Sequence, residues 1–209
     1  MVSSLEPQIA QGCRALGVAA DERAPALLAA FLRLLHKWNR VYNLTAVRDP
    51  QAMVARHVLD SLAVLPWLTR GTLLDVGTGA GLPGLVLAIA RPELEVTLLD
   101  SNAKKLRFVR QAAAELGLAN TTVVQARMQE YQPGRSFDMV ISRAVASMEE
   151  LYRHSHHLLR PGGRMLFMKG ALPQQELEQL APQAGPLHVE TLDIPGLEAE
   201  RHLLWLEKA

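Results

Sequence analysis

The sequence predicts a doubly wound α/β domain preceded by a helical segment, on three observations. In the last two thirds of the chain, short apolar runs alternate with stretches of helical periodicity, which is typical of a parallel sheet with helices on both faces. The stretch 73–84, LLDVGTGAGLPG, ends one apolar run in a glycine-rich turn that leads into another apolar segment. The apolar runs 187–192 and 202–206 are joined through Pro195–Gly196 without a helical pattern. They are expected to form an antiparallel hairpin at the edge of the sheet.

The composition fits one domain with its own core. The chain has 209 residues, 49% of them hydrophobic, and a formal net charge of +1; at this size a core forms without disulfides or metals. The balanced charge gives no general attraction to nucleic acid, so an RNA contact must come from a local basic patch. Cys13 is the one cysteine, which excludes an internal disulfide. With no membrane-length apolar stretch and no secretion signal, we expect a soluble, cytoplasmic protein that does not bind membranes. We also expect a monomer without a bound metal.

Residues 1–70 are expected to form a helical cap ahead of a sheet domain that spans 71–209. Within residues 24–38, apolar side chains recur at the i, i+3, i+4, i+7 spacing of one buried helical face. Asp49 and Pro50 have the residue types of an N-cap and a first helical position, so a second helix is predicted to begin there. Its buried face is predicted to consist of Met53, Val54, Val58, Leu62 and Leu65.

The sheet domain is predicted to hold seven strands. Ahead of the C-terminal hairpin, strands are expected at residues 72–76, 95–99, 121–125, 137–141 and 164–168. Helices are expected at residues 82–90, 102–117, 147–159 and 173–181.

The glycine-rich turn is the predicted cofactor loop, because a strand that ends in such a turn offers backbone N–H groups to a nucleotide-type ligand. Gly79, Gly81 and Gly84 match the spacing of a dinucleotide fingerprint. That register would place a pyrophosphate near the Asp75 carboxylate, which like charge disfavours. The alternative register D-x-G-x-G-x-G runs from Asp75 to Gly81, with Gly77 as its first glycine. In this register the acid lies beside a ligand that carries positive charge and no phosphate, as S-adenosylmethionine does.

Three further residues are expected at this cofactor. Asp100 ends the next predicted strand and is placed to accept hydrogen bonds from ribose hydroxyls. Both dinucleotides and S-adenosylmethionine contain such a ribose, so Asp100 does not separate them. Met128 and Gln129 follow the third strand and are predicted to contact the adenine. An antiparallel last pair of strands suits the methyltransferase type of this architecture better than the dinucleotide-binding type.

The residues at the end of the fourth predicted strand, Ser142 and Arg143, limit which kinds of substrate atom could be methylated. Methylation of an exocyclic amine is usually supported there by Asn or Asp followed by Pro-Pro and an aromatic residue, which this chain lacks. Methylation of a pyrimidine ring carbon needs a cysteine nucleophile, and Cys13 is remote. A ring nitrogen with a free lone pair, such as guanine N7, needs no proton removed before it attacks the methyl group. Catalysis then consists largely of aligning the nitrogen, the methyl group and the sulfur. Arg143 is then predicted to donate to guanine O6, to phosphate or to the cofactor; an ion pair with Asp75 or Asp138 is the structural alternative.

Basic residues in segments that face the same edge of the sheet are candidates for binding RNA phosphates. Lys104 and Arg107 are equally well explained as the exposed side of a helix. Trp38 and Tyr42 flank two of the candidates, and packing is the favoured role of Trp38. The RNA-binding candidates are Lys37, Arg40, Arg48, Arg56, His57, Lys169 and Arg201.

Seven segments resemble a family: HKWNRVYNLTAVRDP (36–50), RHVLDSL (56–62), DVGTGAGLPG (75–84), LLDSNAKKLRFVR (98–110), ISRA (141–144), MKG (168–170) and ERHLL (200–204). They are similar to the bacterial guanine-N7 methyltransferase of 16S ribosomal RNA, also called glucose-inhibited division protein B. The resemblance implies methyl transfer from S-adenosylmethionine to N7 of one guanine in the decoding-region loop, within the 30S subunit or a precursor. It implies cofactor contacts from Gly77, Leu82, Met128, Gln129 and Arg143, with Gln129 standing where many members have Glu.

Three other functions stay open at this point. A small-molecule methyltransferase would close the helical cap over an apolar pocket. An NAD-dependent oxidoreductase would use the dinucleotide register of Gly79, Gly81 and Gly84. A ribosome-assembly factor would bind RNA without cofactor turnover.

Overall fold

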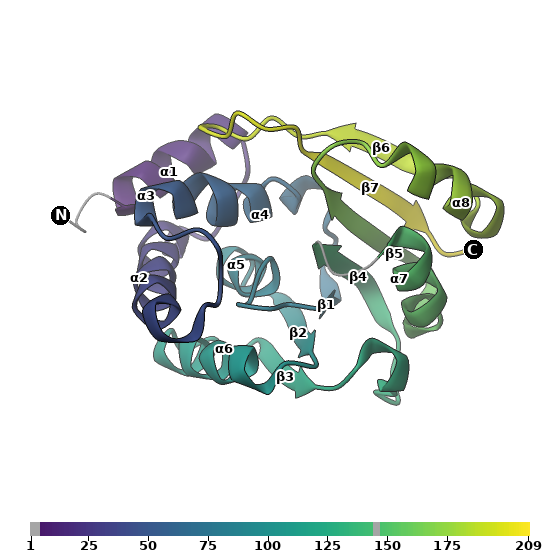
Figure 1. The fold of residues 1–209 in the computed structure, drawn as a ribbon, viewed down its shortest axis with the longest axis horizontal. Coiled ribbons are helices and arrows are strands. Elements are labelled where there is room, and N and C mark those ends of the chain that lie inside the picture. The colour runs from purple at the N-terminus through teal and green to yellow at the C-terminus, as the bar shows by residue number, and fades with distance from the viewer. Residues whose placement is uncertain (1–4, 144–146) are drawn as a thin grey trace.

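A seven-stranded sheet lies at the centre of the computed structural model, which describes residues 5–143 and 147–209, with the side chains of 181–183 excepted (Figure 1). The strand order is β3-β2-β1-β4-β5-β7-β6. Strands β1 to β5 pair in parallel, and β7 runs antiparallel to both β5 and β6. The fold class and the terminal hairpin are therefore as predicted. The strands are β1 (Gly71–Val76), β2 (Leu94–Asp100), β3 (Thr121–Gln125), β4 (Phe137–Arg143), β5 (Leu159–Lys169), β6 (His188–Thr191) and β7 (His202–Glu207).

Helices cover both faces of the sheet, and each face has its own apolar cluster. Helices α5 (Gly84–Ala90) and α6 (Ala103–Glu115) pack with the N-terminal helices on one face, and α7 (Met148–Ser155) and α8 (Gln174–Ala184) lie on the other. Adjacent residues of a strand point to opposite faces. Leu73 accordingly belongs to the first cluster and Leu74 to the second. Strand β1 is thus buried on both sides, which fixes its C-terminal turn against the sheet.

The N-terminal segment consists of α1 (Leu5–Leu16), α2 (Ala24–Tyr42) and a composite helix that starts at Pro50. The Asp49 carboxylate accepts hydrogen bonds from the backbone N–H groups of Gln51 and Ala52, so the predicted N-cap is confirmed. The predicted buried face is also confirmed, because all five of its side chains are buried. No described helix is both long and apolar enough to cross a membrane.

The segment after Asp49 is not the single helix expected from the sequence. The composite helix passes from α3 (Pro50–Met53) through a π-helical turn (Val54–Leu59) into α4 (Asp60–Leu62) and a 3₁₀ turn (Leu65–Trp67). The Ser61 hydroxyl donates to the backbone oxygen of His57 at 2.6 Å, in competition with the regular helical ladder. Such wide turns occur often at functional sites.

The region between β4 and β5 also differs from its predicted boundaries. Helix α7 ends at Ser155, a 3₁₀ turn covers His156–Leu158, and β5 starts at Leu159, within the predicted helix. The pairing of β4 with β5 shifts between Phe137 and Met139, so β5 contains a bulge ahead of its regular part. Ala144, which ends the ISRA segment, lies outside the described residues.

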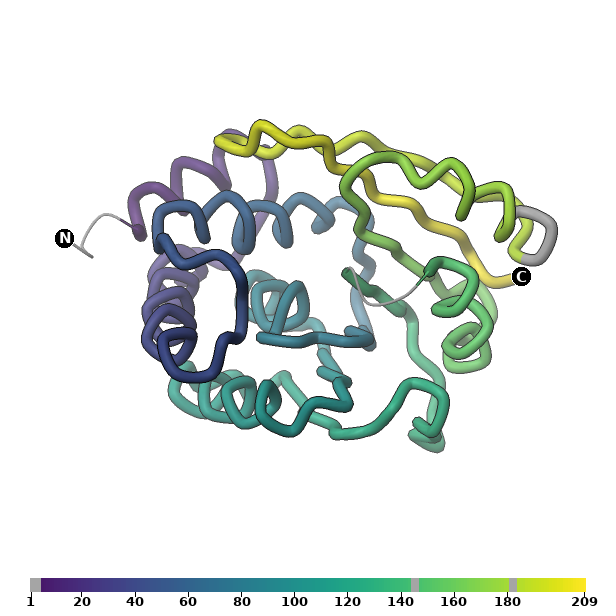
Figure 2. The backbone as a smooth tube through the Cα atoms, in the orientation of Figure 1, coloured from purple at the N-terminus to yellow at the C-terminus, as the bar shows by residue number. Residues whose placement is uncertain are grey.

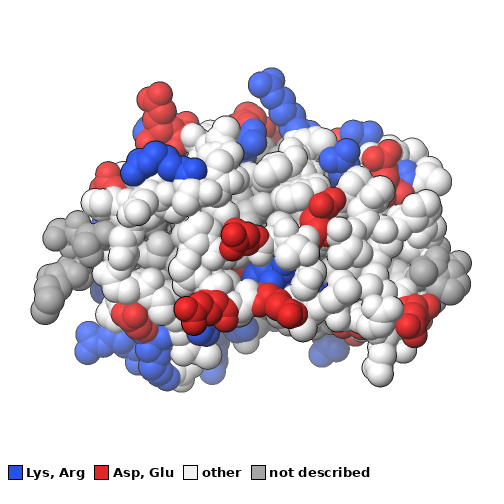
Figure 3. Space-filling model, turned by 90° about the horizontal axis from the view of Figure 1, so that it is seen from above, with Lys and Arg blue, Asp and Glu red and all other residues white. Residues whose placement is uncertain are grey.

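The connection between β6 and β7 runs along α1 on its way back to the sheet (Figure 2). On the face seen from above relative to Figure 1, acidic side chains are scattered and basic ones lie mostly at the margins (Figure 3). This face therefore carries mixed charge.

Candidate active site

A cavity of about 270 Å³ opens at the carboxyl ends of β1, β2 and β3. In a doubly wound sheet this is the edge at which ligands bind. Four of the predicted cofactor residues line it, and sequence reasoning missed Glu150, which comes from the first turn of α7 and has no local motif to mark it. The lining residues are Val76, Gly77, Leu99, Asp100, Ser101, Ala126, Arg127, Met128, Gln129 and Glu150.

The glycine loop has a backbone that requires glycine. Gly77, Gly79 and Gly81 have φ angles of 71°, 56° and 83°, in the left-handed region that side chains disfavour. The loop is tied to β2, because the N–H of Gly79 donates to Oδ2 of Asp100 at 2.8 Å and that of Gly77 donates to the Leu99 carbonyl at 2.8 Å. The loop and the acid at the end of β2 thus form one hydrogen-bonded unit.

Asp75 does not line the cavity, which corrects the expectation of a direct contact with a charged ligand. Its side chain is fully buried, and Oδ2 accepts a hydrogen bond of 2.8 Å from the N–H of Gly84. Burial raises the pKa of Asp75 to about 6, against the lowering effects of the Gly84 hydrogen bond, the nearby Thr78 hydroxyl and the Arg143 charge. The carboxylate also occupies the start of α5, where a dinucleotide pyrophosphate would bind. This geometry disfavours the NAD register.

Leu82 and Asp100 differ in their access to the cavity. The Leu82 side chain is buried and does not line the cavity, and its N–H donates to the Thr78 carbonyl. Asp100 lines the cavity and accepts from the N–H groups of Gly79 and Asn102. Each carboxylate oxygen has a second lone pair, which leaves Asp100 able to accept from ribose hydroxyls.

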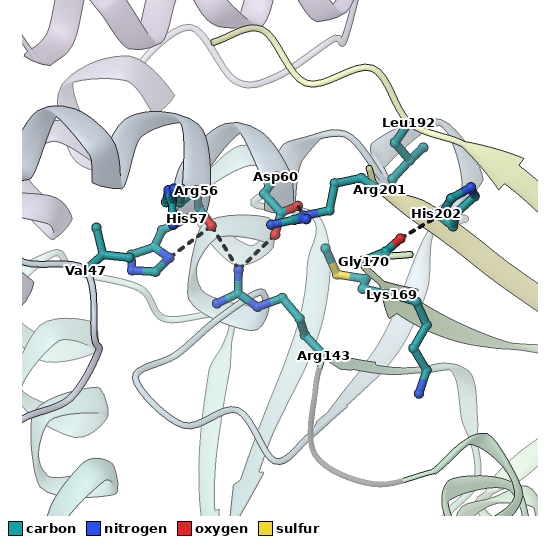
Figure 4. A pocket seen from close by; sticks show the side chains of 11 residues that line it. Val47, Arg56, His57, Asp60, Arg143, Lys169, Gly170, Leu192, Arg201 and His202 are labelled. Carbon is teal, nitrogen blue, oxygen red and sulfur yellow. Dashed lines mark hydrogen bonds and ion pairs between the residues drawn. The ribbon is translucent and has the colours of Figure 1, made fainter. Parts of the chain in front are cut away.

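A second cavity, of about 350 Å³, opens at the ends of β4 and β5 beside the start of β7 and the π-helical turn (Figure 4). Five of the predicted functional residues meet here: Arg56, His57, Arg143, Lys169 and Arg201. They come from segments far apart in the sequence, and Arg143 lies in this cavity rather than in the first one. The other lining residues are Val47, Asp60, Met168, Gly170, Leu192 and His202.

Asp60, which sequence reasoning did not select, binds two arginines in this second cavity. Its buried carboxylate accepts from Nη1 of Arg143 at 3.0 Å through Oδ2 and from Nε of Arg201 at 2.8 Å through Oδ1. Arg143 also donates to the backbone oxygen of Arg56 at 3.3 Å. The suggested pairing of Arg143 with Asp75 or Asp138 is wrong, since its partner is Asp60. The motif RHVLDSL contains Asp60 but gives no indication of these distant partners.

His57 is a neutral, buried group and not a charged contact for RNA. Its Nδ1 lies 3.0 Å from the Arg56 carbonyl and its Nε2 lies 2.9 Å from the Thr45 hydroxyl. Because a carbonyl only accepts, Nδ1 carries the proton and the Thr45 hydroxyl donates to Nε2. Burial is the main cause that lowers the pKa of His57 to about 4, and the nearby Arg143 charge contributes to this lowering.

The remaining RNA candidates differ in their surroundings. Lys169 forms an ion pair of 2.9 Å with Glu176, so part of its charge is balanced. Lys37, Arg40 and Arg48 are exposed on α2 and the loop after it, outside both cavities.

The two aromatic residues beside these cations have different exposures. The rings of Trp38 and Tyr42 stack with centroids 5.2 Å apart. Trp38 also packs on Phe108 with centroids 5.8 Å apart, whereas Tyr42 is 44% exposed. Packing is therefore the role of Trp38, and Tyr42 is the ring that a base can reach.

The strand order, the antiparallel last pair and the cavity at the glycine loop define a class I S-adenosylmethionine-dependent methyltransferase fold. A solved glycopeptide N-methyltransferase, MtfA, aligns with a TM-score of 0.59 at 16% identity, over 77% of this chain and 100% of that one.

The chain belongs to the family described as GidB, rRNA small subunit methyltransferase G, whose model matches residues 25–204. A relative from Alkalilimnicola ehrlichii, named ribosomal RNA small subunit methyltransferase G, is 50% identical over 96% of this chain and 91% of its own length. A relative of the same name from Chromohalobacter salexigens is 49% identical over the full length of both chains. These matches confirm the resemblance stated on sequence motifs.

Proposed function

We propose that the protein transfers a methyl group from S-adenosylmethionine to N7 of one guanine in the decoding-region loop of 16S ribosomal RNA. One observation carries this proposal beyond family membership: a nucleoside-sized cavity and an arginine-bearing cavity open side by side on the carboxyl edge of one sheet. The first suits the cofactor and the second suits a polyanionic substrate. The proposed substrate is the 30S subunit or a precursor, and the protein acts as a monomer.

The residues of the first cavity fit S-adenosylmethionine. Asp100 accepts from the ribose hydroxyls, the half-buried side chain of Met128 packs on the adenine, and Gln129 accepts from its amino group through the amide oxygen. Gly77 brings bare backbone to the amino acid portion, while Gly79, Leu82 and Asp75 hold the loop in shape. When bound, the cofactor supplies a methyl group activated by a sulfonium.

The chemistry asked of the chain is alignment. The N7 lone pair of guanine forms the new C–N bond as the C–S bond breaks and its electron pair moves to sulfur. Positive charge moves from sulfur to the purine, and no proton is transferred. Holding the reacting groups in line therefore provides most of the rate, and no general base is required. Arg143 is the proposed catalytic residue, since its guanidinium donates to guanine O6 or to the adjoining phosphate.

The RNA backbone is proposed to lie over basic residues in and around the second cavity. Arg56, Lys169 and Arg201 line the cavity, and Arg48 continues this basic surface because the neighbouring Val47 lines the cavity. Lys37 and Arg40 extend this basic surface along α2. His57 supports the cavity as an uncharged group.

Two measurements test the proposal. S-adenosylhomocysteine is expected to raise the unfolding temperature of the protein and NAD is not, because Asp75 occupies the start of α5. Incubation with tritiated S-adenosylmethionine and 30S particles from a strain that lacks the protein is expected to label 16S RNA. Protection by NAD alone would favour the oxidoreductase. Cofactor binding without label in RNA would favour a small-molecule methyltransferase or an assembly factor.

A further inference from the structure

We propose that Asp60 is a positioning residue for methyl transfer, which orients the guanidinium groups of Arg143 and Arg201 at the reacting edge and offsets their charge. The inference rests on the proposed function and assigns a role to a residue outside the glycine loop. It also gives the helical cap a part in the reaction, because Asp60 belongs to the cap whereas both arginines belong to the sheet domain.

The orientation of Arg143 follows from its contacts. Its Nη1 donates to Oδ2 of Asp60 at 3.0 Å and to the Arg56 carbonyl at 3.3 Å, so one amino group of the guanidinium faces the cap (Figure 4). A guanidinium is planar and carries five N–H donors. Fixing one side of the plane therefore sets the direction in which the remaining donors point, and those donors are available to substrate or cofactor.

The second arginine is fixed by the same carboxylate. Nε of Arg201 donates to Oδ1 of Asp60 at 2.8 Å, and its Nη1 donates to the Glu200 carbonyl at 2.7 Å. The Asp60 side chain is 4% exposed, compared with 21% for Arg143 and 26% for Arg201. A carboxylate shared in this way is desolvated, and such an arrangement adds little net stability compared with apolar packing. Orientation is the property that it does supply.

Asp60 also affects the reaction through its negative charge. Methylation at N7 places positive charge on the purine, and two unpaired guanidinium groups nearby would oppose that charge. Asp60 cancels one of the two positive charges without blocking the cavity. Replacement of its carboxylate by an amide is therefore expected to slow the chemical step while leaving attraction for RNA unchanged or stronger.

The π-helical turn places Asp60 for this role. The turn spans Val54–Leu59, directly before Asp60, and the buried Ser61 hydroxyl holds its His57 carbonyl. Arg56, His57 and Asp60 all line the second cavity. The widened turn is thus the local structure through which the cap reaches the end of β4 and the start of β7.

The test measures kcat and KM for 30S particles at saturating S-adenosylmethionine for the wild-type protein and the variants Asp60→Asn, Asp60→Glu and Asp138→Asn. Asp138 is the matched control, because it pairs with Arg160 and Thr72 and lines neither cavity. Asp60→Asn is expected to lower kcat about tenfold or more, the scale set by misplaced catalytic groups, with KM no higher than that of the wild type. Asp60→Glu is expected to retain more kcat than Asp60→Asn, and Asp138→Asn is expected to keep both parameters.

Calorimetry with S-adenosylhomocysteine establishes that each variant is folded. If Asp60→Asn does not bind it, Asp60→Glu takes its place, with a lowered kcat and an unchanged KM as the expected result. A normal kcat, or a raised KM with normal kcat, would overturn the assignment of Asp60. Failure of the wild-type protein to methylate the particles would instead overturn the proposed function on which this inference rests.

Discussion

The carboxylate of Asp60 lies 3.0 Å from Nη1 of Arg143, and this ion pair joins the helical cap to the end of β4. The two residues are 83 positions apart in the chain. The Arg143 guanidinium lies near enough to His57 and Asp75 for its charge to lower the pKa of both. Substitutions of the groups around this pair test the roles proposed for both cavities.

Arg143→Lys is expected to lower kcat for RNA methylation by about 10–100-fold, equivalent to about 1.5–3 kcal/mol for hydrogen bonds to a charged group. A lysine retains the charge but presents one ammonium in place of a planar fork, so it cannot hold Asp60 and donate to a ligand in the same geometry. Steady-state kinetics check the prediction. Arg160→Lys, which alters an arginine–aspartate pair away from both cavities, is the control. A normal kcat for Arg143→Lys would contradict the catalytic role.

Asp75→Asn is expected to change the pH dependence of stability. The pKa of Asp75 is raised in the fold from 3.8 to about 6, so between these values the native state binds more protons than the unfolded state. Wild-type stability therefore falls as the pH rises through this window, by about 3 kcal/mol for this group. In urea unfolding from pH 4 to 7, the free energy of unfolding of Asp75→Asn should rise relative to that of the wild type as the pH rises. A constant difference between the two curves would exclude the raised pKa.

His57→Gln is expected to have the opposite pH dependence. The pKa of His57 is lowered from 6.5 to about 4 in the fold, so the unfolded state binds more protons between these values. The wild type loses stability as the pH falls through this window, again by about 3 kcal/mol. Because the pH ranges for Asp75 and His57 overlap, their opposite effects partly cancel in the wild-type stability, and each variant removes one of them. The free energy of unfolding of His57→Gln should rise relative to that of the wild type as the pH falls from 7 to 4. An unchanged difference between the two proteins would show that His57 titrates normally.

Gly84→Ala is expected to destabilise the fold by about 1–3 kcal/mol, as overpacking does, and to weaken binding of S-adenosylhomocysteine. A Cβ at this position would lie 2.6 Å from Oδ2 of Asp75 and would also overlap with Leu98. The change would push Asp75 and the glycine loop apart. Thermal unfolding and calorimetry measure the two effects. Unchanged cofactor affinity would indicate that the loop does not depend on this contact.

Arg48→Gln is expected to weaken RNA binding and to reduce the slope of log K against log salt by about one, as loss of one phosphate contact does. Arg110→Gln, on the exposed side of α6, is the control and should leave the slope unchanged. Fluorescence anisotropy with a 16S RNA fragment across a salt series supplies both slopes. Equal slopes for the wild type and Arg48→Gln would remove Arg48 from the interface.

The parts of the fold that depend on local pattern were predictable. The Asp49 cap contacts residues two and three positions away, and the buried face after it follows helical periodicity. The glycine loop and the terminal hairpin predicted the doubly wound fold and its antiparallel last pair of strands. The boundary at residue 70 between cap and sheet domain stays a prediction, although β1 does begin at Gly71.

The parts of the site that depend on distant contacts were not predictable. Asp60 meets Arg143 and Arg201 across 83 and 141 positions, and no spacing rule links them. Burial also changed the expected chemistry of two residues, since Asp75 faces Gly84 and His57 is neutral. A sequence shows which residues are able to ionise, whereas their solvent exposure depends on the finished fold.

The most direct test of the central claim is to locate the methyl group. After incubation of wild-type protein with tritiated S-adenosylmethionine and 30S particles from a strain lacking the protein, 16S RNA is treated with borohydride and aniline, which cleave at N7-methylguanine. Label is expected at a single guanine in the decoding-region loop, with cleavage there, and Arg143→Lys is expected to slow the appearance of both by about 10–100-fold. Label at another atom or base, or spread over many guanines, would contradict it.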